Sequence, residues 1–195
     1  MKNLIVLLLA FCLSACASTD NNFESRNKNI LTSKLGKKQK YITFANKKYY
    51  FKWASKGVAP KVNEYVLANE SVESWSSLIG VRFYENAIQL KDVLPSYMSS
   101  IKSFLVARPD FIGRRMADPT KDVTLILILT PENKSYYEYD FHRFMVVDGG
   151  VKTYQFAVRF PKLTKQYVDI VLKNQNKWLR ELWHLNIDVY DKLSQ

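Results

Sequence analysis

Cysteine is scarce in this sequence of 195 residues: there are two, Cys12 and Cys16, and both lie near its start. The segment after residue 16 therefore contains no thiol, which excludes a disulfide, a thiolate zinc site and cysteine-based catalysis there. Histidine is equally scarce, with only His142 and His184. The sequence has no serine-hydrolase, P-loop or zinc-protease motif, and its six glycines form no phosphate-binding loop. We therefore expect no cofactor and no resident metal.

Residues 1–15 predict a signal peptide. Lys2 precedes an apolar run, residues 4–13, that is too short to cross a hydrocarbon core of about 30 Å. The run closes with Leu13-Ser14-Ala15-Cys16, which resembles the lipobox of bacterial lipoproteins. The resemblance implies cleavage before Cys16 and lipid on its sulfur. Ala17 in the next position implies, in the common Gram-negative sorting pattern, export to the outer membrane. The alternative is an ordinary secretory signal cut near Cys16.

Acidic residues are absent from residues 26–61, which contain eleven lysines and arginines. We interpret residues 16–40 as a flexible linker between the lipid and a single domain at 41–195. The basic stretch predicts attraction to an anionic surface, most simply membrane lipid head groups. The alternative is a solvated linker, and nucleic acid is not an expected partner of an exported protein. The side chains that we expect at the anionic surface are Lys34, Lys37, Lys38, Lys40, Lys47 and Lys48.

Hydrophobic periodicity predicts an α+β domain in the order β-β-β-α-α-β-β-β-α, with an antiparallel sheet of about six strands packed with three helices. Asp148-Gly149-Gly150 predicts a tight hairpin between the last two strands. The expected strands are residues 41–45, 49–53, 62–67, 123–130, 136–147 and 151–160. The expected helices begin at Ser71, with an apolar stripe through Phe83, at Asp92, with Pro95 in the first turn, and at Thr164.

The last helix is expected to bury one apolar stripe made by Val168, Val171, Leu172, Leu179 and Leu182. Trp178 and Trp183 are five positions apart, so both cannot lie on that stripe, and we expect one of them to be exposed. Truncation of Leu172 is therefore predicted to open a cavity in the core.

The predicted order of elements resembles the PsbP/Mog1-type sandwich, which implies a small exported or binding domain and carries no site residues. Two segments, Asn63-Glu64-Tyr65-Val66 and Ser71-Val72-Glu73-Ser74-Trp75, resemble a pattern in uncharacterised Gram-negative lipoproteins. That resemblance implies no known activity.

Glu138, Asp140 and His142 alternate along one expected strand, so they share a face of the sheet. We interpret them as a polar, solvent-facing row in which His142 can be replaced at little cost. The alternative is the start of a metal or acid–base site, although neighbouring side chains on one strand face stand about 7 Å apart. Arg114 and Arg115 lie in a long expected loop from Arg108 to Lys121 and are candidate contacts for an acidic partner, or a solvated pair.

Together these features predict a non-catalytic lipoprotein on the periplasmic side of the outer membrane, whose domain binds a protein or an envelope component. Two alternatives remain open. One is a toxin-immunity lipoprotein, which would need only a surface complementary to one effector. The other is a hydrolase of envelope polymers, for which the His142 strand face is the only available beginning.

Overall fold

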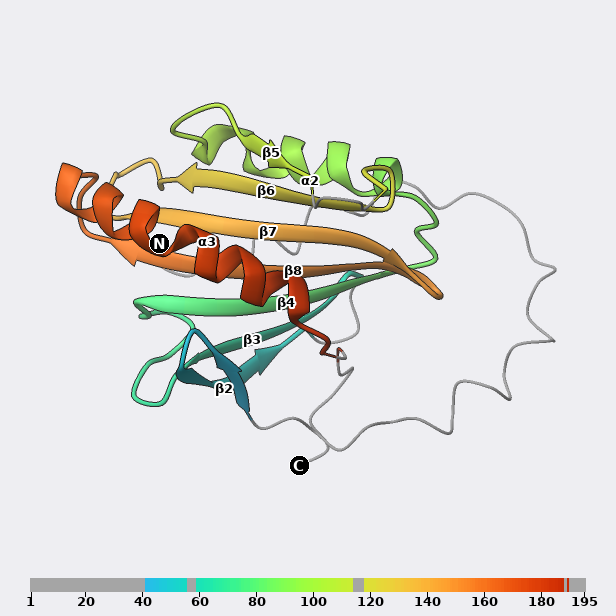
Figure 1. Ribbon diagram of the computed structural model, residues 1–195, viewed down its shortest axis with the longest axis horizontal. Helices are drawn as coiled ribbons and strands as arrows, with labels where there is room; N and C mark the ends of the chain where they lie inside the picture. Colours follow the sequence, from blue (N-terminus) through green and yellow to red (C-terminus); the bar gives the residue numbers. More distant parts are fainter. Residues whose placement is uncertain (1–40, 56–58, 114–117, 188, 190–195) are drawn as a thin grey trace, which may run out of the picture.

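The computed structural model describes residues 41–55, 59–113, 118–187 and 189. These residues form one antiparallel sheet of eight strands and two α-helices (Figure 1). The expectation of about six strands and three helices is therefore wrong. The strands are β1 Tyr41–Phe44, β2 Lys47–Ala54, β3 Lys61–Leu67, β4 Ser77–Glu85, β5 Asp110–Ile112, β6 Asp122–Leu129, β7 Tyr137–Val147 and β8 Gly150–Phe160.

The helical elements lie before β5 and after β8. Helix α2 spans Leu94–Ile101 and is flanked by two 3₁₀ turns, η1 Leu90–Asp92 and η2 Lys102–Phe104. Helix α3 spans Lys165–His184. Thr164 is the N-cap of α3, as predicted, and its hydroxyl accepts a hydrogen bond from the Tyr167 amide.

Two four-stranded meanders make the sheet, whose strand order is β1-β2-β3-β4-β8-β7-β6-β5. Strand β4 pairs with β8 along nine positions, from Ser77↔Val158 to Glu85↔Gly150. The turn between β7 and β8 is the tight hairpin that the sequence predicts, with Gly149 at a φ of 77°.

The helix expected from Ser71 to Phe83 does not exist, because most of that segment is strand β4. Residues 77–82 are all buried, which places apolar side chains on both faces of the sheet. Apolar residues are so frequent in this segment that they also satisfy helical spacing by coincidence. The β-branched residues Ile79 and Val81 suit the extended conformation that the sheet imposes.

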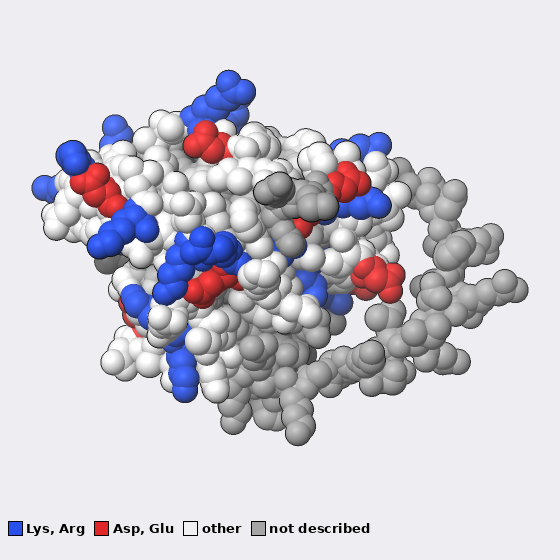
Figure 2. Space-filling view, viewed as in Figure 1, with Lys and Arg blue, Asp and Glu red and all other residues white. Residues whose placement is uncertain are grey.

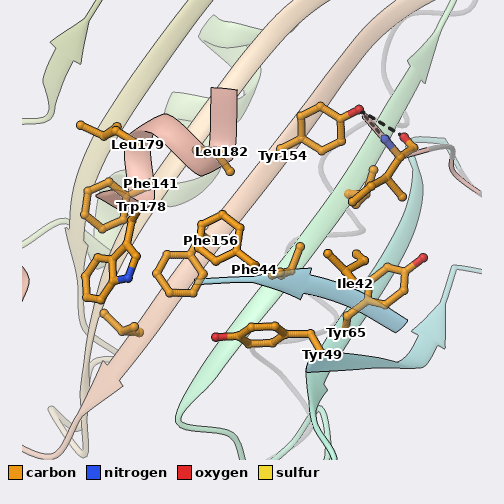
Figure 3. Packing of buried hydrophobic residues seen from close by; sticks show 14 of the residues in the cluster. Ile42, Phe44, Tyr49, Tyr65, Phe141, Tyr154, Phe156, Trp178, Leu179 and Leu182 are labelled. Carbon is orange, nitrogen blue, oxygen red and sulfur yellow. Dashed lines mark hydrogen bonds between the residues drawn. The ribbon is translucent and has the colours of Figure 1, made fainter. Parts of the chain in front are cut away.

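Helix α3 packs across one face of the sheet, in front of β7 and β8 in Figure 1. Figure 3 shows the aromatic centre of this core, where the ring of Phe156 lies 4.5 Å from that of Phe44 and 5.1 Å from that of Trp178. Tyr154 Oη accepts from the Ile187 amide and donates to the Ile187 carbonyl, which fixes the chain beyond α3. Dashed lines from Tyr154 mark these bonds in Figure 3.

The buried stripe of α3 is narrower than expected. Val171, Leu179 and Leu182 are buried, whereas Val168 is half-buried and Leu172 is 52% exposed. Leu172 lies about 100° around the helix from Val171, on the solvent side. The expectation for the tryptophans is also wrong: Trp178 is buried, and Trp183 is half-buried with its Nε1 donating to Thr124 Oγ1 at 3.0 Å.

The other face of the sheet has a second core under α2, at the upper edge in Figure 1. Tyr97 and Ile101 of α2 pack here against Leu125 and Leu127 of β6 and Phe144 of β7. Pro95 lies in the first turn of α2, where its missing N–H is not needed. The segment expected to be a loop from Arg108 to Lys121 contains the short strand β5, which pairs with β6.

Candidate functional site

Polar side chains cross the middle of the face that α2 covers. The register of neighbouring strands aligns His142 of β7, Gln155 of β8, Gly80 of β4 and Glu64 of β3 in one row. Other polar side chains flank this row on the same face. They are Arg82, Glu138, Asp140, Thr153 and Arg159.

His142 is the centre of this polar cluster and is 1% exposed. Arg82 Nη1 lies 3.2 Å from His142 Nε2, and Tyr97 Oη lies 2.6 Å from His142 Nδ1. A guanidinium can only donate, so Nε2 must accept. The neutral ring therefore has its proton on Nδ1 and donates it to the Tyr97 oxygen.

This geometry keeps His142 neutral. Burial lowers its pKa well below the usual 6.5, and the positive charge of Arg82 lowers it further. Protonation of Nε2 would also set its N–H against an Arg82 N–H. Both ring nitrogens are thus engaged within the protein, and His142 connects α2 to the middle of the sheet.

Asp140 is the buried acid of the cluster, with 1% exposure. Its Oδ2 accepts from Gln155 Nε2 at 3.0 Å, and its Oδ1 has no hydrogen-bond partner within the described structure. Burial raises the pKa of Asp140 well above 3.8, and the nearby Glu138 raises it further, against the effect of Arg82. The side chain is therefore adapted to the neutral acid.

Glu138 forms an ion pair with an arginine on β8. Arg159 Nη2 donates to Glu138 Oε1 at 2.8 Å. The Arg159 guanidinium lies between the rings of Trp75 and Tyr136, at 3.8 and 4.0 Å from their centroids. This stacking holds the cation in place at the end of the polar cluster.

Gly80 makes room for the contact between β4 and β8. Arg82 Nη1 also donates to Gln155 Oε1 at 2.8 Å. A Cβ at Gly80 would lie 3.0 Å from that oxygen and 3.1 Å from Arg82 Nη1. The absence of a side chain therefore allows Arg82 to fold over the sheet toward His142.

The sequence analysis correctly predicts that Glu138, Asp140 and His142 share one face of the sheet. Its prediction that this face is exposed to solvent is wrong. All three lie on the face that α2 covers, and Asp140 and His142 are fully buried. Their neighbours Arg82, Gln155 and Tyr97 were missed. Arg82 and Gln155 are each a polar residue inside a largely apolar strand. That pattern indicates a buried polar cluster only once the pairing of the strands is known.

Of the other predicted site residues, the structure describes only Lys47 and Lys48, which are not part of this cluster. Lys47 and Lys48 are exposed at the start of β2. Cys16, Lys34, Lys37, Lys38, Lys40, Arg114 and Arg115 lie outside the described residues.

A second buried cation lies on the face that α3 covers. Arg143 of β7 donates to both carboxylate oxygens of Asp122, at 2.9 and 2.7 Å, and to the Trp183 carbonyl oxygen at 2.8 Å. It is 3% exposed. This arrangement joins the last turn of α3 to β6 and β7, and its role is structural.

Within residues 41–55, 59–113 and 118–187, no three histidine, cysteine or acidic side chains are grouped so that they could hold a metal ion. No helix in this described part is long and apolar enough to cross a membrane.

Comparison with known proteins connects the described fold to a family. No curated protein matches the chain. The model of an uncharacterised bacterial family matches residues 37–187, which include every strand and both helices described above. The chain therefore belongs to this uncharacterised bacterial family.

Proposed function

We propose that this chain is a lipoprotein of the bacterial envelope, held at the periplasmic side of the outer membrane by lipid on Cys16, and that its domain binds a protein or envelope component without catalysing a reaction. The anchor rests on Leu13-Ser14-Ala15-Cys16, with its preceding apolar run. The matched family region begins at residue 37. The proposed anchor and the domain are thus separate parts of the sequence.

The state of His142 is the observation that supports a binding role over catalysis. An envelope hydrolase built on the β7 row would need a base that a substrate can reach. His142 is buried, Arg82 occupies its Nε2, and Tyr97 occupies its Nδ1. Neither ring nitrogen of His142 is free to take a proton from a substrate, so the row of Glu138, Asp140 and His142 suits a structural role.

The start of α3 offers a surface for a protein partner. Leu163 just before the helix and Ile170 and Leu172 within it are 40%, 41% and 52% exposed. Exposed apolar side chains gathered in one short segment are a common feature of protein interfaces. We assign the partner contact to this segment.

The anchor is tested by Cys16→Ala in the cell of origin. We expect the variant to accumulate as unlipidated precursor, and loss of the lipid mass from Cys16 is the measurement. A variant that still matures and fractionates with the outer membrane would refute the proposed anchor.

The absence of catalysis is tested by His142→Gln. Because the amide can accept from Arg82 and donate to Tyr97, the variant should fold and retain function in a complementation assay. Ile170→Asp/Leu172→Asp, at the two exposed positions that flank the buried Val171 of α3, should instead fold and lose the partner. If the His142→Gln protein folds but has no function, a catalytic role of His142 would be favoured over the binding role.

A further inference from the structure

The β1–β2 hairpin forms one end of the sheet, and its two faces differ. Ile42, Phe44 and Tyr49 point into the core beneath α3 and are buried. The alternate positions point to the opposite face. We name these positions the hairpin face: they are Tyr41, Thr43, Lys48 and Tyr50, of which the first three are exposed and Tyr50 is half-buried.

Aromatic and cationic groups are combined on the hairpin face. The rings of Tyr41 and Tyr50 are 6.0 Å apart, and Lys48 Nζ lies 4.8 Å from the centroid of Tyr41. Lys47, also exposed, follows the tight turn at Ala45 and Asn46 and pairs with Phe44, so it lies at the tip of the hairpin beside the hairpin face. In Figure 2 basic side chains project at the lower left of the domain, where Figure 1 places this hairpin.

We propose that the hairpin face rests on an anionic phospholipid surface and so orients the domain on the bilayer. Tyrosine suits the boundary between head groups and acyl chains, because its ring is apolar and its hydroxyl is polar. Lysine adds attraction to phosphate, and its long stem lets the ammonium reach the head groups. The hairpin face carries both kinds of group and no acidic residue.

The position of the hairpin in the chain favours lipid over an acidic protein as the occupant. This inference rests on the proposed anchor at Cys16, from which residues 17–40 lead directly into β1. The hairpin is thus the part of the domain nearest to the lipid in sequence. A tethered surface needs only weak attraction for docking, because the tether raises the local concentration of the bilayer.

The test uses the full lipidated protein in vesicles, either of phosphatidylcholine alone or with phosphatidylglycerol. An amine-acylating reagent is applied at limiting dose, and modification is read at each lysine by mass spectrometry. We expect Lys47 and Lys48 to react about fivefold more slowly in the anionic vesicles, the effect of one well-placed lysine near such a surface. Lys173, exposed on α3 at the opposite face, is the internal control and should react equally in both.

Charge reversal separates docking from tethering. Lys48→Glu should restore the reactivity of Lys47 in anionic vesicles, whereas the matched variant Lys173→Glu should not. High salt should restore it in the wild type, because salt screens surface charge. Equal reactivity of Lys47 and Lys48 in the two vesicle types would overturn the inference. So would protection that appears only when envelope proteins are added, since that would assign the hairpin face to an acidic protein.

Vesicle flotation keeps the two proposals distinguishable. A protein without lipid on Cys16 would fail to float with vesicles of phosphatidylcholine alone, which would refute the anchor. A protein that floats with both compositions and shows no protection of Lys47 and Lys48 would refute only the docking of the hairpin face.

Discussion

Arg143 donates to the main-chain oxygen of Trp183 at 2.8 Å, and so connects the middle of the sheet to the last turn of α3. The same guanidinium holds both oxygens of Asp122. A cation at the carboxyl end of a helix is favoured by the exposed carbonyls and by the helix dipole. One side chain therefore fixes β6, β7 and α3 relative to each other.

Arg143→Ala should destabilise the protein by about 2–4 kcal/mol. This cost lies between that of losing one hydrogen bond to a charged group and that of breaking a fully buried ion pair. The measurement is urea unfolding followed by tryptophan fluorescence. The matched control is Lys165→Ala, which removes an exposed pair with Asp169 and should cost no more than about 0.5 kcal/mol. Similar costs at the two positions would show that Arg143 does not hold the helix.

His142→Ala should cost about 2–4 kcal/mol, because it leaves Arg82 and Tyr97 without their partner and opens a space beneath α2. This replaces the expectation, drawn from the sequence, of a nearly neutral change. Tyr97→Phe in the His142→Ala background should cost less than in the wild type, since the two side chains share one hydrogen bond. Additive costs in this double-mutant cycle would contradict the arrangement.

The pKa of His142 also predicts how stability depends on pH. The pKa of His142 is lowered in the folded protein. As pH falls below 6.5, His142 therefore binds a proton in the unfolded chain but not in the folded one. The stability that His142 contributes is present above pH 6.5 and is lost as pH falls toward the lowered pKa. Unfolding at pH 5 and pH 7 should show a smaller difference in His142→Gln than in the wild type. An equal difference in the two proteins would contradict this assignment.

Asp140 should act in the opposite direction. Its pKa is raised in the folded protein, so the stability it contributes is present below pH 3.8 and is lost as pH rises toward the raised pKa. Asp140→Asn retains an acceptor for Gln155 and cannot ionise. Its stability relative to the wild type should therefore increase between pH 4 and pH 7. A constant difference across that range would show that Asp140 titrates alike in both states.

Leu172 and Leu182 form a matched pair on α3, since the substitution is the same and the exposure differs. Leu182 is fully buried and Leu172 is 52% exposed. Leu182→Ala should cost about 2–5 kcal/mol by creating a cavity, and Leu172→Ala no more than about 0.5 kcal/mol. Thermal unfolding of both variants measures the contrast, and equal costs would mean that α3 presents a different face to the sheet.

Sequence patterns identified the elements whose signals are local. The turn before Gly150 and the Thr164 cap depend on nearby residues, and both were predicted correctly. Strand β4 was mistaken for a helix, because its burial depends on pairing with β8, which is distant in the chain. The same limit applies to the polar cluster. Arg82 meets His142 only through strand pairing, and the cover of α2 converts an apparently solvated row into a buried one.

The central pairing of β4 with β8 has a consequence for the folding rate. Each meander closes through short connections, but β4 and β8 join residues that are roughly 65 to 80 positions apart. Contacts at that separation must offset a large loop entropy before they contribute to stability, so sheets built on them fold slowly. We expect the two halves to acquire structure before this seam forms. Substitutions at the seam, such as Ile79→Val, should then mainly speed unfolding, while those inside one meander should slow folding.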